Sequence, residues 1–285
     1  MVIFHKIKDV TNFLCLAKDK NKTIGFVPTM GALHKGHISL ITSADKEVEI
    51  IVCSIFVNPT QFNDVKDYEK YPITIAQDVY QLEKAGCTVL FLPSPTEMYP
   101  GKFLNERHFE LGYLETILDG KYRPGHFQGV CQVVHKLLEI ILPDKLYLGQ
   151  KDYQQCLVLK KMTAEYFPEI FIKICPTQRE INGLAMSSRN LRLSVKQQTM
   201  AAELYASLQS ISHTIKSGNL EPLLNKAIKD LTAQGFKVDY IEIANATTLQ
   251  IINDWNGKES FIILIAAFLD DVRLIDNLLQ STDTT

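Results

Sequence analysis

The sequence predicts an α/β protein, with a Rossmann-like parallel sheet in an N-terminal domain and a smaller α+β domain after it. Up to about residue 176, short β-branched runs alternate with helical patterns, which is typical of a parallel sheet covered by helices. Beyond Ser194 two amphipathic helices precede three strands. The length of 285 residues favours two domains. We expect them at residues 1–176 and 177–285, because the segment 176–190 is poor in apolar periodicity.

Five apolar runs are the predicted strands of the first domain, at residues 23–27, 49–57, 88–92, 145–148 and 170–175. Most of them are apolar enough to be buried on both faces, as strands between two helical layers are. The clearest helix repeats apolar residues at helical spacing and ends before Pro143; its apolar residues are Val130, Val133, Val134, Leu137, Leu138 and Ile141. We expect this helix to pack on the sheet.

The second domain begins with two helices. One carries Leu204, Leu208, Ile211 and Ile215, and the other spans residues 220–234 and ends at Gly235. Strands are predicted at residues 238–243, 260–267 and 272–275. This order predicts an α+β unit of about a hundred residues.

The composition is that of a soluble globular enzyme, with 46% hydrophobic and 22% charged residues. Thirty Lys and Arg against 32 Asp and Glu leave no basic excess for nucleic acid. The longest apolar run, residues 261–269, is far short of the roughly 20 residues that span a bilayer. Charges interrupt the N-terminal apolar residues, so we expect no secretory signal and a cytoplasmic protein. The six cysteines form no C-x-x-C pair and are predicted to be small buried residues.

The most informative segment, residues 25–37, leaves the first strand and enters a helix near Ile38. It contains an H-x-G-H pattern formed by His34, Gly36 and His37. Glycines let the backbone approach a ligand, and a helix start offers N–H groups and a positive dipole end to phosphate. Two histidine donors there would stabilise an α-phosphate attacked by a carboxylate, the step that forms an acyl adenylate.

Two other interpretations of His34 and His37 compete with this one. They could be ordinary surface or core histidines, or two ligands of a zinc site, and the short motif alone leaves roughly even odds. A zinc site needs further ligands, and the histidines at 5, 108, 126, 135 and 213 form no recognisable ligand spacing. The strand–loop–helix position favours nucleotide chemistry.

Five further blocks accompany this motif, at residues 54–62, 71–78, 123–127, 149–155 and 186–190. In order, spacing and length the sequence resembles the pantothenate synthetase family over nearly the whole chain. The resemblance implies that pantoate and β-alanine are condensed to pantothenate, with ATP cleaved to AMP and pyrophosphate through a pantoyl adenylate. It also implies a homodimer.

Gln61 and Gln155 follow predicted strands, where ligands of open α/β sheets collect. Their amides both donate and accept, which suits the hydroxyl and carboxylate groups of pantoate. An isolated glutamine is more often a surface amide. The resemblance implies that Met30, Gln61 and Gln155 bind pantoate, and that Gln61 also binds β-alanine.

Lys151 offers a mobile charge and Arg189 a rigid fork of donors, both suited to the phosphates of ATP, although isolated cations are usually solvated. The resemblance makes them catalytic together with His34 and His37. Asp152 is a candidate for the ribose hydroxyls or, nearly as well, for a helix N-cap, and Gln178 for a main-chain contact to ATP. The implied ATP-binding set is Pro28, Thr29, Met30, His34, Gly36, His37, Gly149, Gln150, Lys151, Asp152, Gln178, Met186, Ser187, Ser188 and Arg189.

Asp78 is the candidate carboxylate for the Mg²⁺ that accompanies ATP, an ion that binds mainly through phosphates and water. The family often has two adjacent acids here, whereas Gln77 precedes Asp78 in this chain. Three more departures are Ile73 for an arginine, Gln150 for a glutamate and Asn182 for an aspartate. They bear on ATP affinity or loop order.

Three other classes of protein stay open. A nucleotidyltransferase would bind a phosphate acceptor with more Lys or Arg than the neutral Gln61 and Gln155 provide. A tRNA synthetase would need a basic face. A non-catalytic zinc module would hold about one ion per chain.

Overall fold

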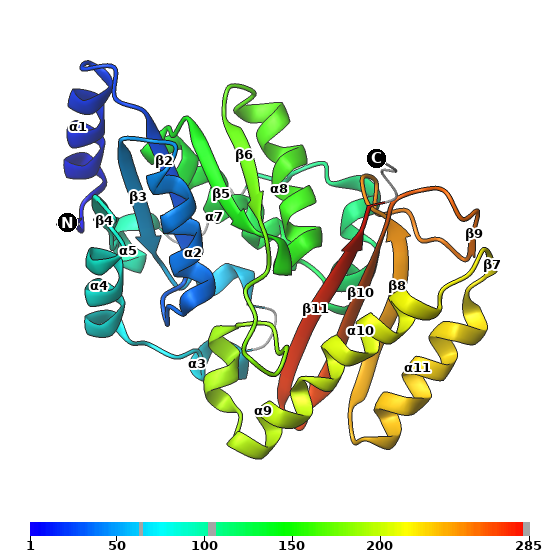
Figure 1. The fold of residues 1–285 in the computed structure, drawn as a ribbon. Helices are drawn as coiled ribbons and strands as arrows, with labels where there is room; N and C mark the ends of the chain where they lie inside the picture. Colours follow the sequence, from blue (N-terminus) through cyan, green and yellow to red (C-terminus); the bar gives the residue numbers. More distant parts are fainter. Residues whose placement is uncertain (63–64, 102–106, 282–285) are drawn as a thin grey trace. The chain divides into compact units, whose positions relative to one another are not determined.

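The computed structural model describes residues 1–62, 65–101 and 107–281. The chain divides into two compact units (Figure 1). The first contains Met1–Gln150 and Gln155–Thr177, and the second contains Lys151–Gln154 and Gln178–Thr285. The short segment Lys151–Gln154, which precedes residue 176 in sequence, therefore packs with the second unit.

The first unit is built on a six-stranded sheet in the order β1-β4-β3-β2-β5-β6, and all neighbouring strands are parallel. The strands are β1 (Val2–Phe4), β2 (Ile24–Thr29), β3 (Ile50–Ile55), β4 (Val89–Phe91), β5 (Lys145–Gly149) and β6 (Phe171–Cys175). The fold class predicted from the sequence is confirmed, and the five predicted strands are present. The strand order reverses between β2 and β5, so loops leaving their carboxyl ends meet at the switch point where such sheets bind ligands.

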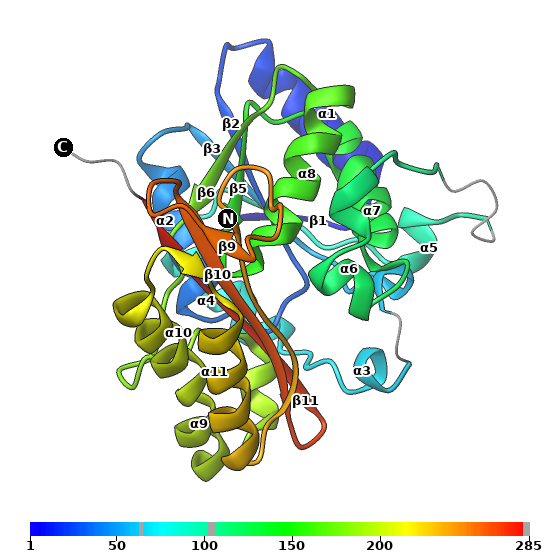
Figure 2. The same ribbon diagram turned by 90° about the vertical axis from the view of Figure 1, so that its right-hand side faces the viewer.

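Helices cover both faces of this sheet (Figure 2). In the first unit they are α1 (Ile7–Lys18), α2 (Lys35–Asp45), α3 (Val65–Glu69), α4 (Ile75–Lys84), α5 (Pro95–Met98), α6 (Leu118–Tyr122), α7 (His126–Ile141) and most of α8 (Tyr153–Tyr166). Phe26 and Leu146 belong to the core under α1, α7 and α8, whereas Val27 and Tyr147 belong to the core under α2 and α4. Successive strand residues thus alternate between two buried cores, as a parallel sheet between two helical layers requires.

The predicted helix on the sheet is α7, and twelve of its sixteen residues are buried. It starts after Gly125 at φ 79° and ends at Ile141, and the next residue, Leu142, is left-handed at φ 47° directly before Pro143. Proline disfavours the helical conformation in the residue before it, which explains the end of the helix.

The second unit holds a three-stranded antiparallel sheet in the order β11-β10-β8. Its strands are β8 (Lys237–Asn245), β10 (Phe261–Leu269) and β11 (Val272–Gln280), and its helices are α9 (Val195–Ala201), α10 (Glu203–Thr214) and α11 (Glu221–Ala233). The helices α10 and α11 lie on one face of the sheet (Figure 2). Two short strands, β7 (Gly218–Asn219) and β9 (Asp254–Trp255), form a separate pair. Gly235 follows α11 at φ 96°, as its predicted helix-ending role requires.

The prediction that the cysteines are buried can now be judged. Five cysteines are buried, but Cys15 is exposed on α1, so the prediction of burial is wrong for that residue. It lies on the outer face of an amphipathic helix whose buried residues are Val10, Leu14 and Ala17. Among the described residues, no helix is both long and apolar enough to cross a membrane.

Candidate functional site

The H-x-G-H segment forms the start of α2, and its two histidines cap that helix. His34 is the N-cap residue, and its Nδ1 accepts a hydrogen bond of 3.1 Å from the Gly36 N–H. The Nδ1 atom of His37 accepts a hydrogen bond of 3.3 Å from the His34 N–H. The two ring centroids are 4.0 Å apart. Because each Nδ1 is an acceptor, the neutral ring carries its proton on Nε2, so both rings present an Nε2–H donor at the positive end of a helix.

Asp78 of α4 holds the loop between β2 and α2 through hydrogen bonds to its main chain. Its carboxylate is fully buried and accepts hydrogen bonds from the N–H groups of Ala32 at 3.0 Å and Leu33 at 2.8 Å, and from the Thr74 hydroxyl at 3.0 Å. Gly31 is left-handed at φ 83°, and an added Cβ would stand 3.2 Å from the Asp78 carboxylate. Asp78 thus fixes the backbone that presents His34.

Pro28 and Thr29 end β2. Thr29 donates from its hydroxyl to the Ser54 carbonyl at 2.7 Å and accepts from the Gly31 N–H at 3.3 Å. The pairing of β2 with β5 stops at Phe26, before Pro28, which has no N–H to donate. These contacts close the strand and begin the loop.

Gln61 lies in the 3₁₀ turn Pro59–Gln61 after β3, and its amide contacts the loop after β2. Its Nε2 is 3.1 Å from the Met30 sulfur, so the structure brings together two of the residues expected to bind pantoate. The Gln61 carbonyl is 2.8 Å from Nδ1 of the buried His126, whose Nε2 is 3.0 Å from Arg123. His126 and Arg123 therefore hold the main chain of Gln61, a role that the sequence motif at 123–127 did not reveal.

The carboxyl end of β5 supplies the next candidates. Gly149 is its last residue, and an added Cβ there would meet no atom of the part of the chain that the structure describes within 4 Å. Gln150 follows it and is half-buried, as is Gln155 in the first turn of α8. β2 and β5 are adjacent strands, so Gly149 and the H-x-G-H loop leave the sheet at the same switch point.

Lys151 and Asp152 belong to the second unit. The Lys151 ammonium is 3.5 Å from the Asp152 carboxylate, and the Lys151 side chain is 17% exposed. Asn277 of β11 donates from its side-chain amide to the Lys151 carbonyl at 2.8 Å. The lysine stem is flexible, so its main chain must be fixed if the ammonium is to act at a defined place.

The remaining candidates lie on a hairpin of the second unit that ends in a 3₁₀ turn. The Met186 N–H donates to the Gln178 carbonyl at 3.0 Å, and Arg179 forms a bridge with Ala185. Ser187 caps the turn Ser188–Arg192, and its hydroxyl accepts from the Arg189 N–H at 3.3 Å. The hairpin therefore places Gln178 beside Met186, at the entry to the Ser187–Arg189 segment.

The four departures from the family pattern lie in different surroundings. Ile73 and Gln77 are exposed, and Gln150 is half-buried. Asn182 keeps an acceptor for the Leu184 N–H at 3.2 Å, which is the contact an aspartate would make there.

In residues 1–62, 65–101 and 107–281 no group of three or more His, Cys, Asp and Glu side chains could hold a metal ion.

Comparison with known proteins gives one consistent result. The model of the pantoate–β-alanine ligase family matches residues 2–279. A pantothenate synthetase from Cytophaga hutchinsonii is 42% identical over 98% of this chain and 99% of its own, and one from Bacteroides fragilis is 42% identical over 98% of each. A crystal structure of the Thermus thermophilus pantothenate synthetase has a TM-score of 0.88 at 36% identity, and covers 98% of this chain and 99% of its own. The crystal structure of the Francisella tularensis pantoate–β-alanine ligase, complexed with β,γ-ATP and β-alanine, has a TM-score of 0.80 at 41% identity. It covers 100% of this chain and 99% of its own. Both the sequence match and the fold lead to the same conclusion, that this chain belongs to the pantoate–β-alanine ligase family.

Proposed function

We propose that this chain joins pantoate to β-alanine with the consumption of ATP, the amide-forming step of pantothenate biosynthesis. Family membership supports the reaction, and the Francisella relative is described as a complex with β,γ-ATP and β-alanine. The observation that carries the proposal is the start of α2, where Nδ1 of both His34 and His37 accepts a capping hydrogen bond, which leaves Nε2–H as the donor of each ring at the positive end of the helix dipole. That is an arrangement for binding phosphate.

In the first half-reaction, a carboxylate oxygen of pantoate attacks the α-phosphorus of ATP. A C–O–P linkage forms, the bond to the bridging oxygen breaks, and pyrophosphate leaves. We assign His34 and His37 to the negative charge that grows on the α-phosphate, and Lys151 and Arg189 to the departing phosphates. These groups act by position and charge, so no covalent nucleophile is needed.

In the second half-reaction, the neutral amine of β-alanine attacks the carbonyl carbon of pantoyl adenylate. The amide C–N bond forms, the amine loses a proton, and AMP leaves with the electrons of the broken C–O bond. We propose that Gln61 contacts pantoate and β-alanine together, and that Gln155 and Met30 hold pantoate. The 3.1 Å contact between Gln61 and the Met30 sulfur supports a shared site for these two residues.

Mg²⁺ enters this scheme as the counter-ion of ATP, where it would neutralise phosphate charge. The Asp78 carboxylate already accepts three hydrogen bonds and is fully buried, so its first role is to hold the loop at Ala32 and Leu33. A direct bond from Asp78 to Mg²⁺ stays a prediction, and no step of the reaction depends on it.

We also propose a cytoplasmic homodimer. The six free thiols are compatible with a reducing compartment.

ATP–pyrophosphate exchange measured with pantoate and without β-alanine tests the proposal, because it reports the adenylate step alone. Exchange should depend on pantoate and should fall strongly in Lys151→Ala, whereas reaction of preformed pantoyl adenylate with β-alanine should change little. Exchange without pantoate, or transfer of AMP to a phosphate-bearing acceptor, would instead support a nucleotidyltransferase.

A further inference from the structure

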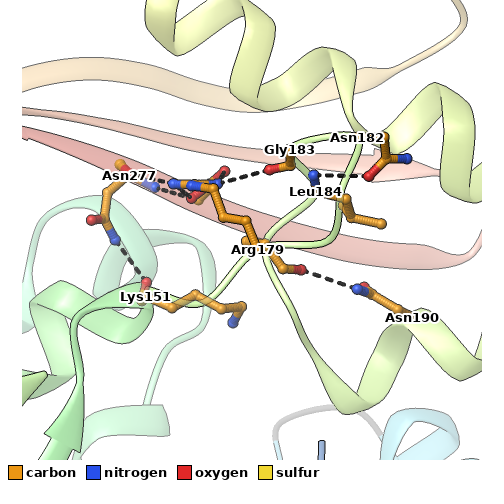
Figure 3. Close-up of polar contacts among 9 residues, drawn as sticks. Lys151, Arg179, Asn182, Gly183, Leu184, Asn190 and Asn277 are labelled. Atoms are coloured by element: carbon orange, nitrogen blue, oxygen red, sulfur yellow. Dashed lines mark hydrogen bonds and ion pairs between the residues drawn. The ribbon is translucent and has the colours of Figure 1, made fainter. Parts of the chain in front are cut away.

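The segment Lys151–Gln154 is fastened to the second unit at two points. The Asn277 amide donates to the Lys151 carbonyl at 2.8 Å, and the Tyr153 hydroxyl donates to the Ala246 carbonyl at 2.6 Å. Asn277 is only 1% exposed, so its amide acts in a place that water scarcely reaches. Figure 3 shows this amide pointing at the main chain of Lys151.

Asn277 is in turn fixed by a buried ion pair. Arg179 donates to both oxygens of Asp276, at 2.6 and 2.9 Å, and its Nη2 also donates to the Asn277 carbonyl at 3.2 Å. The Arg179 guanidinium lies 3.6 Å from the centre of the Tyr205 ring. Asp276 is 4% exposed, and burial raises the pKa of its carboxyl while Arg179 opposes that rise.

The same arginine holds the hairpin that leads to Ser187. Its Nη1 donates to the Gly183 carbonyl at 3.1 Å, at the turn of the hairpin (Figure 3). Gly183 is left-handed at φ 92°, and an added Cβ there would stand 2.8 Å from the Tyr205 ring. The Arg179 guanidinium therefore joins the hairpin that carries Gln178 and Met186 to β11, whose Asn277 donates to Lys151.

A buried ion pair is weak as a source of stability, because desolvation offsets most of its attraction. Its two members are 97 residues apart. They fix the hairpin that carries Gln178 and Met186 to β11, and β11 in turn holds the main chain of Lys151 through Asn277. We propose that Asn277, Arg179 and Asp276 are positioning residues, with Asn277 holding the main chain of Lys151 so that its ammonium meets the phosphates of ATP. This inference rests on the function proposed for Lys151.

The test compares two substitutions on β11. Asn277→Leu removes the donor to Lys151, and Gln280→Leu is the matched control, since its amide donates to Ser212 at 2.7 Å and lies away from Lys151 along the same strand. We expect Asn277→Leu to slow pantoate-dependent ATP–pyrophosphate exchange by about tenfold, the effect of losing one buried hydrogen bond and the geometry that it fixes. Reaction of preformed pantoyl adenylate with β-alanine should stay within about twofold, because the phosphates on which Lys151 acts have then left. The control should leave both rates unchanged.

A double-mutant cycle with Lys151→Ala separates positioning from a general loss of stability. If Asn277 acts through Lys151, Asn277→Leu should add almost nothing to the loss already caused by Lys151→Ala. Additive losses, or an equal slowing of both half-reactions, would overturn the inference. Should Asn277→Leu fail to fold, Tyr153→Phe removes the second attachment and takes its place in the same cycle. If the unmodified chain shows no ATP–pyrophosphate exchange, the proposed function itself is refuted. If the unmodified chain shows exchange but the losses from Asn277→Leu and Lys151→Ala add, only the positioning role is refuted.

Discussion

Gly129 of α7 is the position at which a single methyl group should most directly disturb the placement of Gln61. An added Cβ would stand 2.5 Å from the Thr60 carbonyl oxygen and 2.7 Å from the Gln61 Cα, and both are main-chain atoms that cannot rotate away. The close approach is held from the other side, because the Asn58 amide donates to the Gly129 carbonyl at 3.2 Å. In Gly129→Ala, either α7 or the turn at Pro59–Gln61 must therefore move.

The size of the effect follows from these distances. Real Cβ atoms essentially never come closer than 3.0 Å to such a neighbour, so the turn must shift by at least 0.5 Å relative to α7. Overpacking of this kind costs about 1–3 kcal/mol. In an unobstructed helix, replacing glycine by alanine would instead stabilise the protein by about 0.5–1 kcal/mol. A lower free energy of unfolding in Gly129→Ala would therefore show that overpacking outweighs the gain in helix propensity. A displaced Gln61 should lower kcat/KM for pantoate by about ten- to a hundredfold.

Two measurements check this prediction: pantoate-dependent ATP–pyrophosphate exchange, and the free energy of unfolding from urea titration. The KM for pantoate should rise more than that for ATP. Gly101→Ala is the control, because an added Cβ there meets no atom of the described residues within 4 Å. A folded Gly129→Ala enzyme with unchanged kcat/KM for pantoate, or with greater stability, would refute the reasoning.

Three further predictions concern single side chains. His37→Ala should fold but lose about a hundredfold or more in adenylation rate, measured at saturating ATP and pantoate. Gln155→Ala should narrow the ratio of kcat/KM between pantoate and an analogue without its hydroxyl groups, whereas an equal fall for both acids would mean that Gln155 does not recognise those hydroxyls. Lys173 and Lys145 lower the pKa of Glu47 to about 2, so its stabilising effect is complete above the usual glutamate pKa and is lost as the pH falls toward 2. Glu47→Gln should accordingly lose less unfolding free energy than the unmodified chain between about pH 6 and about pH 2.5.

The sheet of the first unit could be predicted because its longer strands are mostly apolar, although Ser54 interrupts β3 and Lys173 interrupts β6. β1 was missed because only three residues form it and two of them are exposed, so neither length nor pattern distinguishes it from a loop. β11 was predicted to end at Ile275, five residues early. The next residues, Asp276 and Asn277, are polar but buried, and a polar pair ordinarily marks a strand end. Their partner Arg179 is too distant in sequence for any local pattern to reveal the pairing.

The residues of the candidate site could be predicted where they belong to a short sequence motif. Residues that position another residue through a long-range hydrogen bond could not be predicted. The position of His34 and His37 at a helix start followed from the strand–loop–helix pattern. A carboxylate near an ATP site suggests Mg²⁺, so the sequence indicates Asp78 as a metal ligand, and that stays a prediction. The hydrogen bonds of Asp78 to the loop N–H groups are visible only in the structure. His126 had no assigned role, since its bond to the Gln61 carbonyl joins residues 65 positions apart.

His34 combines two tasks in one ring, and a pair of variants should separate them. Its Nδ1 caps α2 by accepting from the Gly36 N–H, and its Nε2–H is the proposed donor to phosphate. Asparagine is a strong N-cap residue, so His34→Asn should keep most of the cap and lose the phosphate donor, whereas His34→Ala loses both. We expect His34→Ala to be less stable than His34→Asn by about 1 kcal/mol in urea unfolding. Adenylation should fall strongly in both variants, because the asparagine amide that caps the helix cannot also reach where Nε2 stood. If the activity of the two variants followed their stability, with His34→Asn close to the unmodified enzyme, the ring would serve the helix alone and the phosphate role of His34 would be lost.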